Sequence, residues 1–332
     1  MPPLEGACQA QTNSEGIRML DSGRATSIRA ISLVSSGILW VSGSGGWVGR
    51  SVDGGHHWSW NQVPGKGDYR SLKAFSAYRA LVINAGSPAT IRMTRNGGKS
   101  WRVVYRNRRS SIFFDGVAFW NNRRGIAVSD PVAGRFFLIK TQDGGQTWKP
   151  MVLSQRPEAD SGEACFAASN SALLTGLGSA IWIATGGIRS RVLHSPNGGR
   201  TWESADCPVL HGLSSTGLFS IACREGRCVA VGGDYQADQV RLGNSCLSTD
   251  GGSTWERPII NPRGYRSSVV FDGPMLLVAT GSSGTDLSRD GGTTWKPLSP
   301  TGFNVAASLG DDGPVWLAGA GGRIAQWVQT PR

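Results

Sequence analysis

Short apolar segments recur along the chain, each ending in small residues and followed by a second apolar segment. In the first unit, Arg29–Val34 (RAISLV) and Ile38–Gly43 (ILWVSG) are followed by Trp47–Val52 and His56–Val63. Runs of this length between Gly- and Ser-rich stretches are typical of β-strands. The pattern therefore predicts units of four short strands. The corresponding first and second strands of the next five units are 72–77 and 80–86, 115–120 and 125–130, 165–169 and 180–187, 219–223 and 228–233, and 267–271 and 275–281.

One octapeptide, S/T-x-D/N-G-G-x-x-W, stands between the third and fourth strand of these units. Its copies are Ser51–Trp58, Thr94–Trp101, Thr141–Trp148, Ser195–Trp202, Ser248–Trp255 and Ser288–Trp295. Their Asp/Asn positions are 40 to 54 residues apart, which is the period of one four-stranded propeller blade. An Asp or Asn that accepts backbone N–H groups, followed by glycines that adopt positive φ, predicts a tight hairpin turn. We therefore interpret the octapeptides as structural and their tryptophans as apolar plugs between strands.

A seventh unit, 304–328, contains three strands but no octapeptide. The missing outer strand is available in Ile17–Asp21, which belongs to no other unit. Pairing of these two ends would close the ring and hide both sheet edges. We therefore predict an all-β fold, a single seven-bladed β-propeller over residues 17–328. Residues 1–16 are expected to be disordered or the remnant of a leader, and 329–332 a tail.

Composition narrows the range of functions. The 47 glycines and 13 tryptophans agree with a turn-rich all-β protein, and 28 of the 34 basic residues are arginine at a net charge of +11. No run of five basic residues occurs, so we expect no nucleic-acid partner. No apolar stretch is long enough for a membrane helix, and no leader is visible at the start.

The six cysteines predict neither a metal site nor a cofactor, because none forms a C-x-x-C pair. Cys223 and Cys228 flank a four-residue segment and are expected to face each other across a hairpin. A disulfide there would indicate an oxidising compartment, whereas two packed thiols would explain the spacing nearly as well.

Charged residues gather in the loops that we expect at one mouth of the central channel, opposite the octapeptide turns. One set precedes the innermost strands, and the other lies between second and third strands. The candidate binding residues are Arg29, Arg70, Asp115, Glu163 and Arg266 in the first set, and Asp130, Arg135, Arg191, Asp234, Tyr235 and Asp286 in the second. Charges beside small apolar side chains are costly unless they pair or meet a ligand. They predict either a lattice of ion pairs or a site for a partner's carboxylate or phosphate.

The octapeptide is that of the BNR/Asp-box families, and the chain resembles one of them, the photosystem II stability/assembly factors and their bacterial relatives. The resemblance rests on segments between residues 17 and 328: IRMLDSG, LWVSGSGGWVGRSVDGG, FFDGVAFW, VSDPVAGRF, SRVLHSPNGGRTW, AVGGDY, GYRSSVV and GAGGRIAQW. It implies a seven-bladed propeller with Asp-box turns and a non-catalytic, periplasmic or secreted scaffold that docks other proteins through an arginine-rich surface. We accordingly expect a monomer that binds an acidic protein segment or another carboxylate-bearing ligand, next to a membrane complex.

The alternative is an exo-sialidase or other glycoside hydrolase, because sialidases share the Asp box. Such an enzyme grips a sugar carboxylate with three arginines, a role that Arg29, Arg191 and Arg266 could take. Tyr265 or Tyr235 would then be the nucleophile and Asp115 the acid. The sequence departs from that pattern, since Ser27–Ala30 stands where an R-I-P motif is expected and no Glu lies near either tyrosine. A shared fold is by itself weak support for a shared activity.

Overall fold

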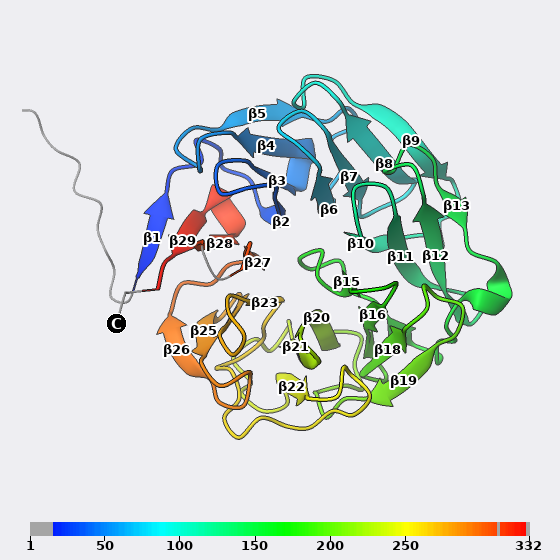
Figure 1. Ribbon diagram of the computed structural model, residues 1–332, viewed down its shortest axis with the longest axis vertical. Helices are drawn as coiled ribbons and strands as arrows, with labels where there is room; N and C mark the ends of the chain where they lie inside the picture. The colour runs from blue at the N-terminus through cyan, green and yellow to red at the C-terminus, as the bar shows by residue number, and fades with distance from the viewer. Residues whose placement is uncertain (1–15, 311–312, 330–332) are drawn as a thin grey trace, which may run out of the picture.

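The computed structural model describes residues 16–310 and 313–329, which form seven antiparallel sheets around a central channel (Figure 1). The architecture is a seven-bladed β-propeller, as predicted. The expectations for residues 1–15 and 330–332 concern parts of the chain outside the described residues. Within the described residues no helix is long and apolar enough to cross a bilayer.

The first three blades each consist of four consecutive strands, ordered from the channel outward. They are β2 (Ile28–Leu33), β3 (Leu39–Gly43), β4 (Trp47–Ser51) and β5 (Ser59–Gln62); β6 (Tyr69–Ala74), β7 (Ala80–Asn84), β8 (Ala89–Thr94) and β9 (Arg102–Asn107); and β10 (Phe114–Phe119), β11 (Gly125–Val132), β12 (Arg135–Thr141) and β13 (Lys149–Pro150).

The remaining blades follow the same order, except that the fifth and seventh sheets also contain strands from other parts of the chain. They are β15 (Leu173–Thr175), β16 (Ile181–Ala184), β18 (Arg191–Ser195) and β19 (Glu203–Asp206); β20 (Thr216–Arg224), β21 (Arg227–Asp234) and β22 (Ser245–Ser248); β23 (Ser268–Phe271), β24 (Leu277–Gly281), β25 (Gly284–Ser288) and β26 (Lys296–Ser299); and β27 (Val305–Ala307), β28 (Val315–Ala318) and β29 (Ile324–Trp327). The fifth sheet also includes β14 (Glu163–Ala164) and β17 (Gly186–Gly187), and the seventh includes β1 (Ile17–Leu20). Three short 3-10 turns are η1 (Ser44–Gly46), η2 (Leu153–Gln155) and η3 (Ala320–Gly322).

The hydrophobic core is divided among the blade interfaces. One cluster, for example, joins Leu81 and Ile83 of β7 to Val117 of β10 and Phe137 of β12. Because each blade packs between two neighbours, its middle strands are buried on both faces, as in β3 and β24. This explains why the strands read as continuous apolar runs and not as an alternation of apolar and polar residues.

The two ends of the chain meet in the seventh sheet. β1 pairs antiparallel with β29, with Ile17 opposite Trp327 and Leu20 opposite Ile324, and the two strands lie side by side in Figure 1. The outer strand of this blade therefore comes from the N-terminal side of the chain, and the edge of β29 is covered.

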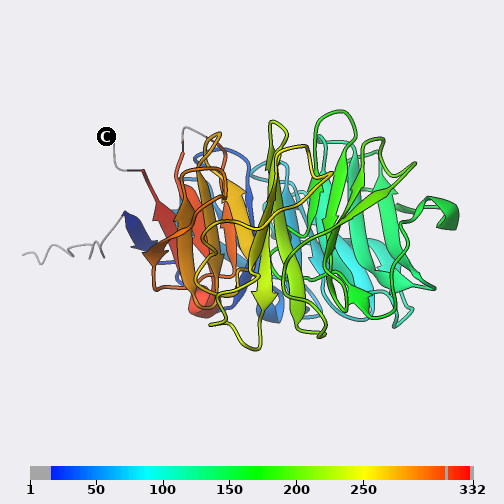
Figure 2. The ribbon, with the colours of Figure 1, turned by 90° about the horizontal axis from the view of Figure 1, so that it is seen from below.

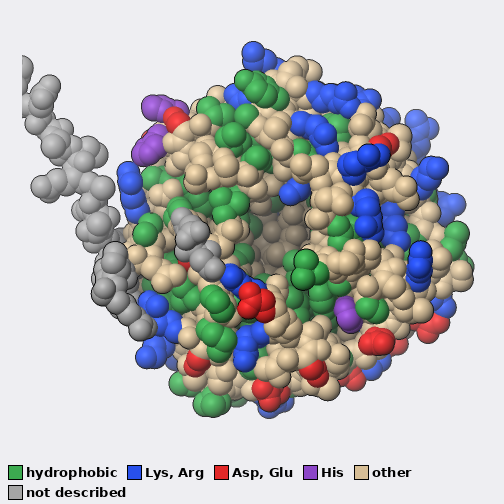
Figure 3. Space-filling model, in the orientation of Figure 1, with side chains coloured by type: hydrophobic (Ala, Val, Ile, Leu, Met, Phe, Trp, Pro, Cys, Tyr) green, Lys and Arg blue, Asp and Glu red, His purple; other side chains and the backbone are tan. Residues whose placement is uncertain are grey.

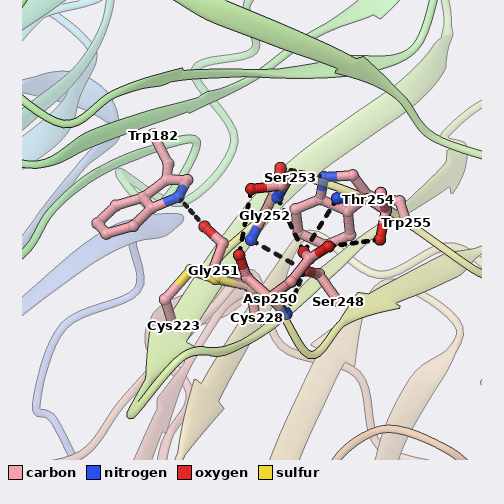
Figure 4. The surroundings of a disulfide bond; sticks show 10 residues. All are labelled: Trp182, Cys223, Cys228, Ser248, Asp250, Gly251, Gly252, Ser253, Thr254 and Trp255. Atoms are coloured by element: carbon pink, nitrogen blue, oxygen red, sulfur yellow. Dashed lines mark hydrogen bonds between the residues drawn. A yellow bond between two sulfur atoms is a disulfide. The ribbon is translucent and has the colours of Figure 1, made fainter.

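The octapeptides form the turns that follow the third strand of their blades; Figure 4 draws the Ser248–Trp255 turn, which follows β22 and leads to a single bridge between Leu247 and Glu256. The N–H of Gly252 donates to Ser248 Oγ at 2.9 Å, and the N–H groups of Ser253 and Thr254 donate to Asp250 Oδ1 at 3.0 Å. The φ of Gly252 is +98°, a conformation that favours glycine. The Ser/Thr hydroxyl accepts the same glycine N–H in all six turns. In these turns the octapeptide side chains therefore bond to the backbone of their own turn.

A disulfide joins Cys223 and Cys228, which face each other across the β20–β21 hairpin beside this turn (Figure 4). Cys165, Cys207 and Cys246 are buried free thiols. Cys8 lies outside the described residues.

The inner strand of the fourth blade was predicted incorrectly. Residues 165–169 are not a strand, and the inner strand is β15, further along the chain. The segment that precedes β15 instead lies across the channel mouth, where Phe166 stacks on Phe219 with ring centroids 4.0 Å apart. Its apolar and small residues pack against the channel wall, which the sequence pattern does not distinguish from packing between blades.

Candidate functional site

A cavity of about 500 Å³ occupies the channel at the mouth that the inner-strand loops surround. Figure 3 shows the hollow at the centre of the disc. Its lining comes from six blades and from the segment before β15, so no single sequence motif builds it. The lining residues are Arg29, Arg70, Phe113, Asp115, Asp130, Ala164, Cys165, Phe166, Ala167, Ala168, Phe219, Tyr235, Tyr265, Ser267, Ser282 and Asn304.

One wall of the cavity is aromatic. The ring of Phe219 stacks on Phe166 and meets Tyr265 edge-on, with centroids 4.8 Å apart. Tyr235 packs edge-on against Phe219 at 6.1 Å. Burial raises the pKa of the Tyr265 hydroxyl, so this residue is a neutral phenol at physiological pH. Such a wall suits the apolar part of a ligand.

Arg29, on β2, lines the cavity without a counter-ion. Its guanidinium makes no hydrogen bond or ion pair with the described part of the chain, and its Nε is buried without a partner. Burial and the neighbouring charge of Arg70 lower the pKa of Arg29, and Tyr265 and Asp68 offset only part of this effect. Arg70, by contrast, donates from Nε to Asp68 at 2.7 Å. A partly buried arginine without an acceptor is unfavourable until a ligand supplies one.

Two carboxyl groups face the same cavity from blade three. Asp115 on β10 is only 1% exposed, and burial, followed by the proximity of Asp130, raises its pKa well above the usual range. Neither of its oxygens has a well-formed hydrogen bond, and the nearby N–H groups of Asp130 and Ala167 offset only part of this effect. Burial raises the pKa of Asp130 to about 6, although its Oδ1 accepts the Cys165 N–H at 3.1 Å. The raised pKa of Asp115 makes this carboxyl group a poor counter-ion for Arg29.

Two predicted pairs of opposite charge lie outside this cavity and bind each other. Arg191 donates from Nε to Glu163 Oε1 at 2.8 Å and from Nη2 to Oε2 at 2.7 Å, and both side chains are buried. Arg266, which is 0% exposed, donates from Nε to Asp286 Oδ2 at 2.7 Å. These four residues therefore form ion pairs within the chain, which is one of the two alternatives that the sequence left open.

The last two predicted residues also have partners nearby. Arg135 pairs with Glu158 and, together with Arg191, lines a separate cavity of about 300 Å³. Asp234 is buried and accepts the N–H of Gln236 at 2.9 Å. The structure thus brings together Arg29, Arg70, Asp115, Asp130 and Tyr235, and separates the other six from them.

This placement bears on the sialidase alternative. Of the three arginines assigned to the sugar carboxylate, only Arg29 lines the central cavity, while Arg191 and Arg266 are held by carboxylates of the chain itself. No glutamate is among the residues that line the cavity. The glycosidase assignment therefore has no support in the arrangement of these side chains.

Sequence reasoning missed the aromatic and amide members of the site, Phe113, Phe166, Phe219 and Asn304. An aromatic residue among small ones, as in LFSIAC and CFAAS, is the signal that was available for Phe219 and Phe166. Asn304 gave no such signal, because its amide donates to the Ile28 carbonyl at 2.8 Å and to Ser27 Oγ at 3.3 Å, both at the other end of the chain.

Comparisons with known proteins place the fold. No protein-family model matches the sequence, and no curated protein matches it either. Among solved structures the chain is similar to YCF48 bound to a D1 peptide, at 14% identity and a TM-score of 0.70 over 96% of this chain and 99% of that one. It is also similar to YCF48 from Cyanidioschyzon merolae (16% identity, TM-score 0.62, 94% and 98% covered) and to the Pan2 WD40 domain of Neurospora crassa (10%, 0.65, 97% and 98%). At these identities the likeness shows the propeller fold alone.

Proposed function

We propose that this protein is a non-catalytic scaffold that binds an acidic segment of another protein in its central cavity, in the manner of a photosystem II assembly factor. The observation that carries the proposal is Arg29, a partly buried cation in the cavity with no counter-ion among the described residues. A carboxylate from a partner would supply the missing acceptor. The structural likeness to YCF48, which has been solved with a D1 peptide, supports peptide binding as the mode.

The charge balance of the cavity favours an anionic segment. Burial raises the pKa of Asp115 well above its usual range and that of Asp130 to about 6, so these carboxyl groups oppose less of the positive charge that Arg29 brings to the cavity. The aromatic wall of Phe166, Phe219 and Tyr235 lies beside this arginine and would pack the apolar part of the same segment. The cavity therefore combines one apolar and one basic surface.

The test is direct peptide binding. A fluorescent peptide rich in Glu and Leu and its Gln-for-Glu counterpart are titrated with the protein and followed by anisotropy. We expect the acidic peptide to bind more tightly, and Arg29→Gln to weaken that binding by about 2 kcal/mol or more, since a partly desolvated charge pair is lost. Arg108→Gln, at an exposed position outside the cavity, is the matched control and should matter little.

Two results would contradict the proposal. Equal losses for Arg29→Gln and Arg108→Gln would show that the cavity is not the binding site. Sugar release from sialosides or acidic glycans that Arg29→Gln abolishes would establish the glycosidase alternative instead.

We further propose that the protein acts outside the cytoplasm as a monomer. The Cys223–Cys228 disulfide supports an oxidising compartment, where such bonds persist. Peptide mapping without reductant on protein isolated from its native compartment tests this, and two free thiols there would remove the support.

A further inference from the structure

The net charge of the protein is concentrated in two of its seven blades. Residues 69–156, which form blades two and three and the loop after them, contain sixteen Lys and Arg but only three Asp and Glu, a formal charge of +13. The rest of the chain contains eighteen basic and twenty acidic residues, a formal charge of −2. A difference of this size gives the disc one strongly basic side.

The exposure of the charged side chains strengthens the contrast between residues 69–156 and the rest of the chain. Nine basic side chains of this segment are exposed: Arg95, Lys99, Arg102, Arg106, Arg108, Arg109, Arg123, Arg124 and Lys149. Its three acids are not, since Asp115 is buried, and Asp130 and Asp143 are partly covered. None of the nine makes an ion pair with a described carboxylate, whereas Arg135 and Arg189 outside this group do.

The basic residues follow the outer rim of the disc. Figure 3 shows Lys and Arg side chains along the upper and right-hand rim, over β8, β9 and β13, and acidic side chains along the lower rim. We call the group Arg102, Arg106, Arg108, Arg109 and Lys149 the basic rim. The first two lie on β9, the next two directly follow it, and the last lies on β13, so all belong to the outer strands of adjacent blades or their ends.

An apolar tip stands at the edge of the basic rim. η2 projects from the side of the disc as the green coil at the right of Figure 2. Val152 and Leu153 at its start are 59% and 53% exposed, and Lys149 precedes them. Arg156 follows and anchors the tip, because its Nε donates to the Met151 carbonyl at 2.9 Å and its guanidinium lies over the Phe137 ring.

From these observations we propose that the basic rim is a docking surface for a bilayer of anionic phospholipids. Lys and Arg near such a surface each improve partitioning by about fivefold, and the effect sums over a diffuse array without any pocket. A short exposed apolar tip between basic residues fits the boundary between headgroups and acyl chains. With the rim on the bilayer, the channel axis lies parallel to the membrane, and the central cavity opens along its surface.

The surface chemistry favours lipid over a nucleic acid or an acidic protein. Stacking on exposed aromatic rings is the usual basis of single-strand binding, and tight protein interfaces use aromatic anchors. In residues 69–156 Tyr78 is the one exposed aromatic side chain, and it lies outside the basic rim. The rim thus offers charge and a small apolar tip, without a stacking platform.

The test uses vesicles of phosphatidylcholine alone and of phosphatidylcholine mixed with phosphatidylglycerol, in sedimentation assays at low and high salt. The rim variant is R102Q/R106Q/R108Q/R109Q. The matched control is R241Q/R257Q/R289Q/K296Q, which removes the same number of exposed charges from blades five and six. Circular dichroism and thermal melts confirm that both variants are folded.

We expect the protein to sediment with the mixed vesicles at low salt but not with phosphatidylcholine alone. The rim variant should lose at least about tenfold in partitioning, since four cations are removed from one surface. The control should retain binding within about threefold, and Val152→Ser/Leu153→Ser should weaken it at high salt, where electrostatic attraction is screened.

Three outcomes would overturn the proposal: no binding to mixed vesicles, equal losses in the rim and control variants, or binding of the rim to duplex DNA or polyglutamate in preference to vesicles. The acidic-peptide titration tests the cavity through Arg29→Gln, because Arg29 lines the cavity and does not belong to the rim, whereas Arg108→Gln is a rim control in that experiment. Failure of vesicle binding leaves the proposed function standing. Failure of acidic-peptide binding likewise leaves the proposed membrane surface standing.

Discussion

The channel mouth contains two groups of charged residues that arise from similar loops but differ in how they are satisfied. Arg191 and Arg266 are buried in contact with Glu163 and Asp286, and each donates more than one hydrogen bond to its partner. Arg29 has no such acceptor among the described residues, and Asp115, which lines the same cavity, has a pKa that burial raises well above its usual range. The first group is structural because its charges are already compensated. The second group remains available to a ligand because its charge is not compensated.

The largest effect is expected on breaking a compensated pair. Asp286→Ala leaves the Arg266 guanidinium buried without its carboxylate and should destabilise the fold by about 3 to 5 kcal/mol. Urea unfolding measures the change. The double variant Arg266→Met/Asp286→Leu removes both charges and should recover much of the loss; a double variant as unstable as the single one would contradict the role of pairing.

A neutral substitute for Asp115 tests the second group. Because the pKa of Asp115 is raised in the folded state, its contribution to stability is fully present below the pKa of an unfolded carboxyl, near 4, and is lost as the pH rises through the folded pKa. Asp115→Asn should therefore melt higher than the parent at pH 8, and the difference should shrink toward pH 4. Thermal melts across this range measure it, and a constant difference would show that the pKa of Asp115 is the same in the folded and unfolded states.

Binding of an acidic peptide should depend on the ionisation of Asp130. The pKa of this group is raised to about 6, so lowering the pH through that value removes a negative charge from the cavity. Affinity should therefore increase severalfold from about pH 7.5 to about pH 5.5. Because no histidine lines the cavity, we attribute this pH dependence to Asp130. The isosteric Asp130→Asn should bind at the low-pH affinity throughout. A variant that keeps the full pH dependence would assign it to another group.

The smallest effect concerns stability after loss of Arg29. Removing a cation that has no partner breaks no internal hydrogen bond, so Arg29→Gln should leave the free energy of unfolding within about 0.5 kcal/mol of the parent. Arg191→Gln, by contrast, disrupts the buried pair with Glu163 and should be clearly destabilising. Similar unfolding midpoints for the two variants would erase the distinction between the groups.

The sequence alone determined the propeller, because its turns and strands depend on local chemistry. The octapeptides specify their own hydrogen bonds within eight residues, as in Ser51–Trp58, where the Gly55 N–H donates to Ser51 Oγ and the His57 N–H to Asp53 Oδ1. The apolar runs between these turns, such as Leu39–Gly43, could be predicted as strands because strands buried on both faces are apolar throughout. The number of such units then predicted the number of blades.

Only the tertiary structure decided which charges form a site. The sequence offered Arg29 and Arg191 equally as binding residues, yet Arg191 meets Glu163 because the segment before β15 crosses the channel mouth and places that carboxyl beside it. The same crossing brings Phe166 onto Phe219 and leaves a cavity next to Arg29. Such contacts join residues from different blades, so their geometry depends on the closed ring, and no local pattern of residue types encodes it.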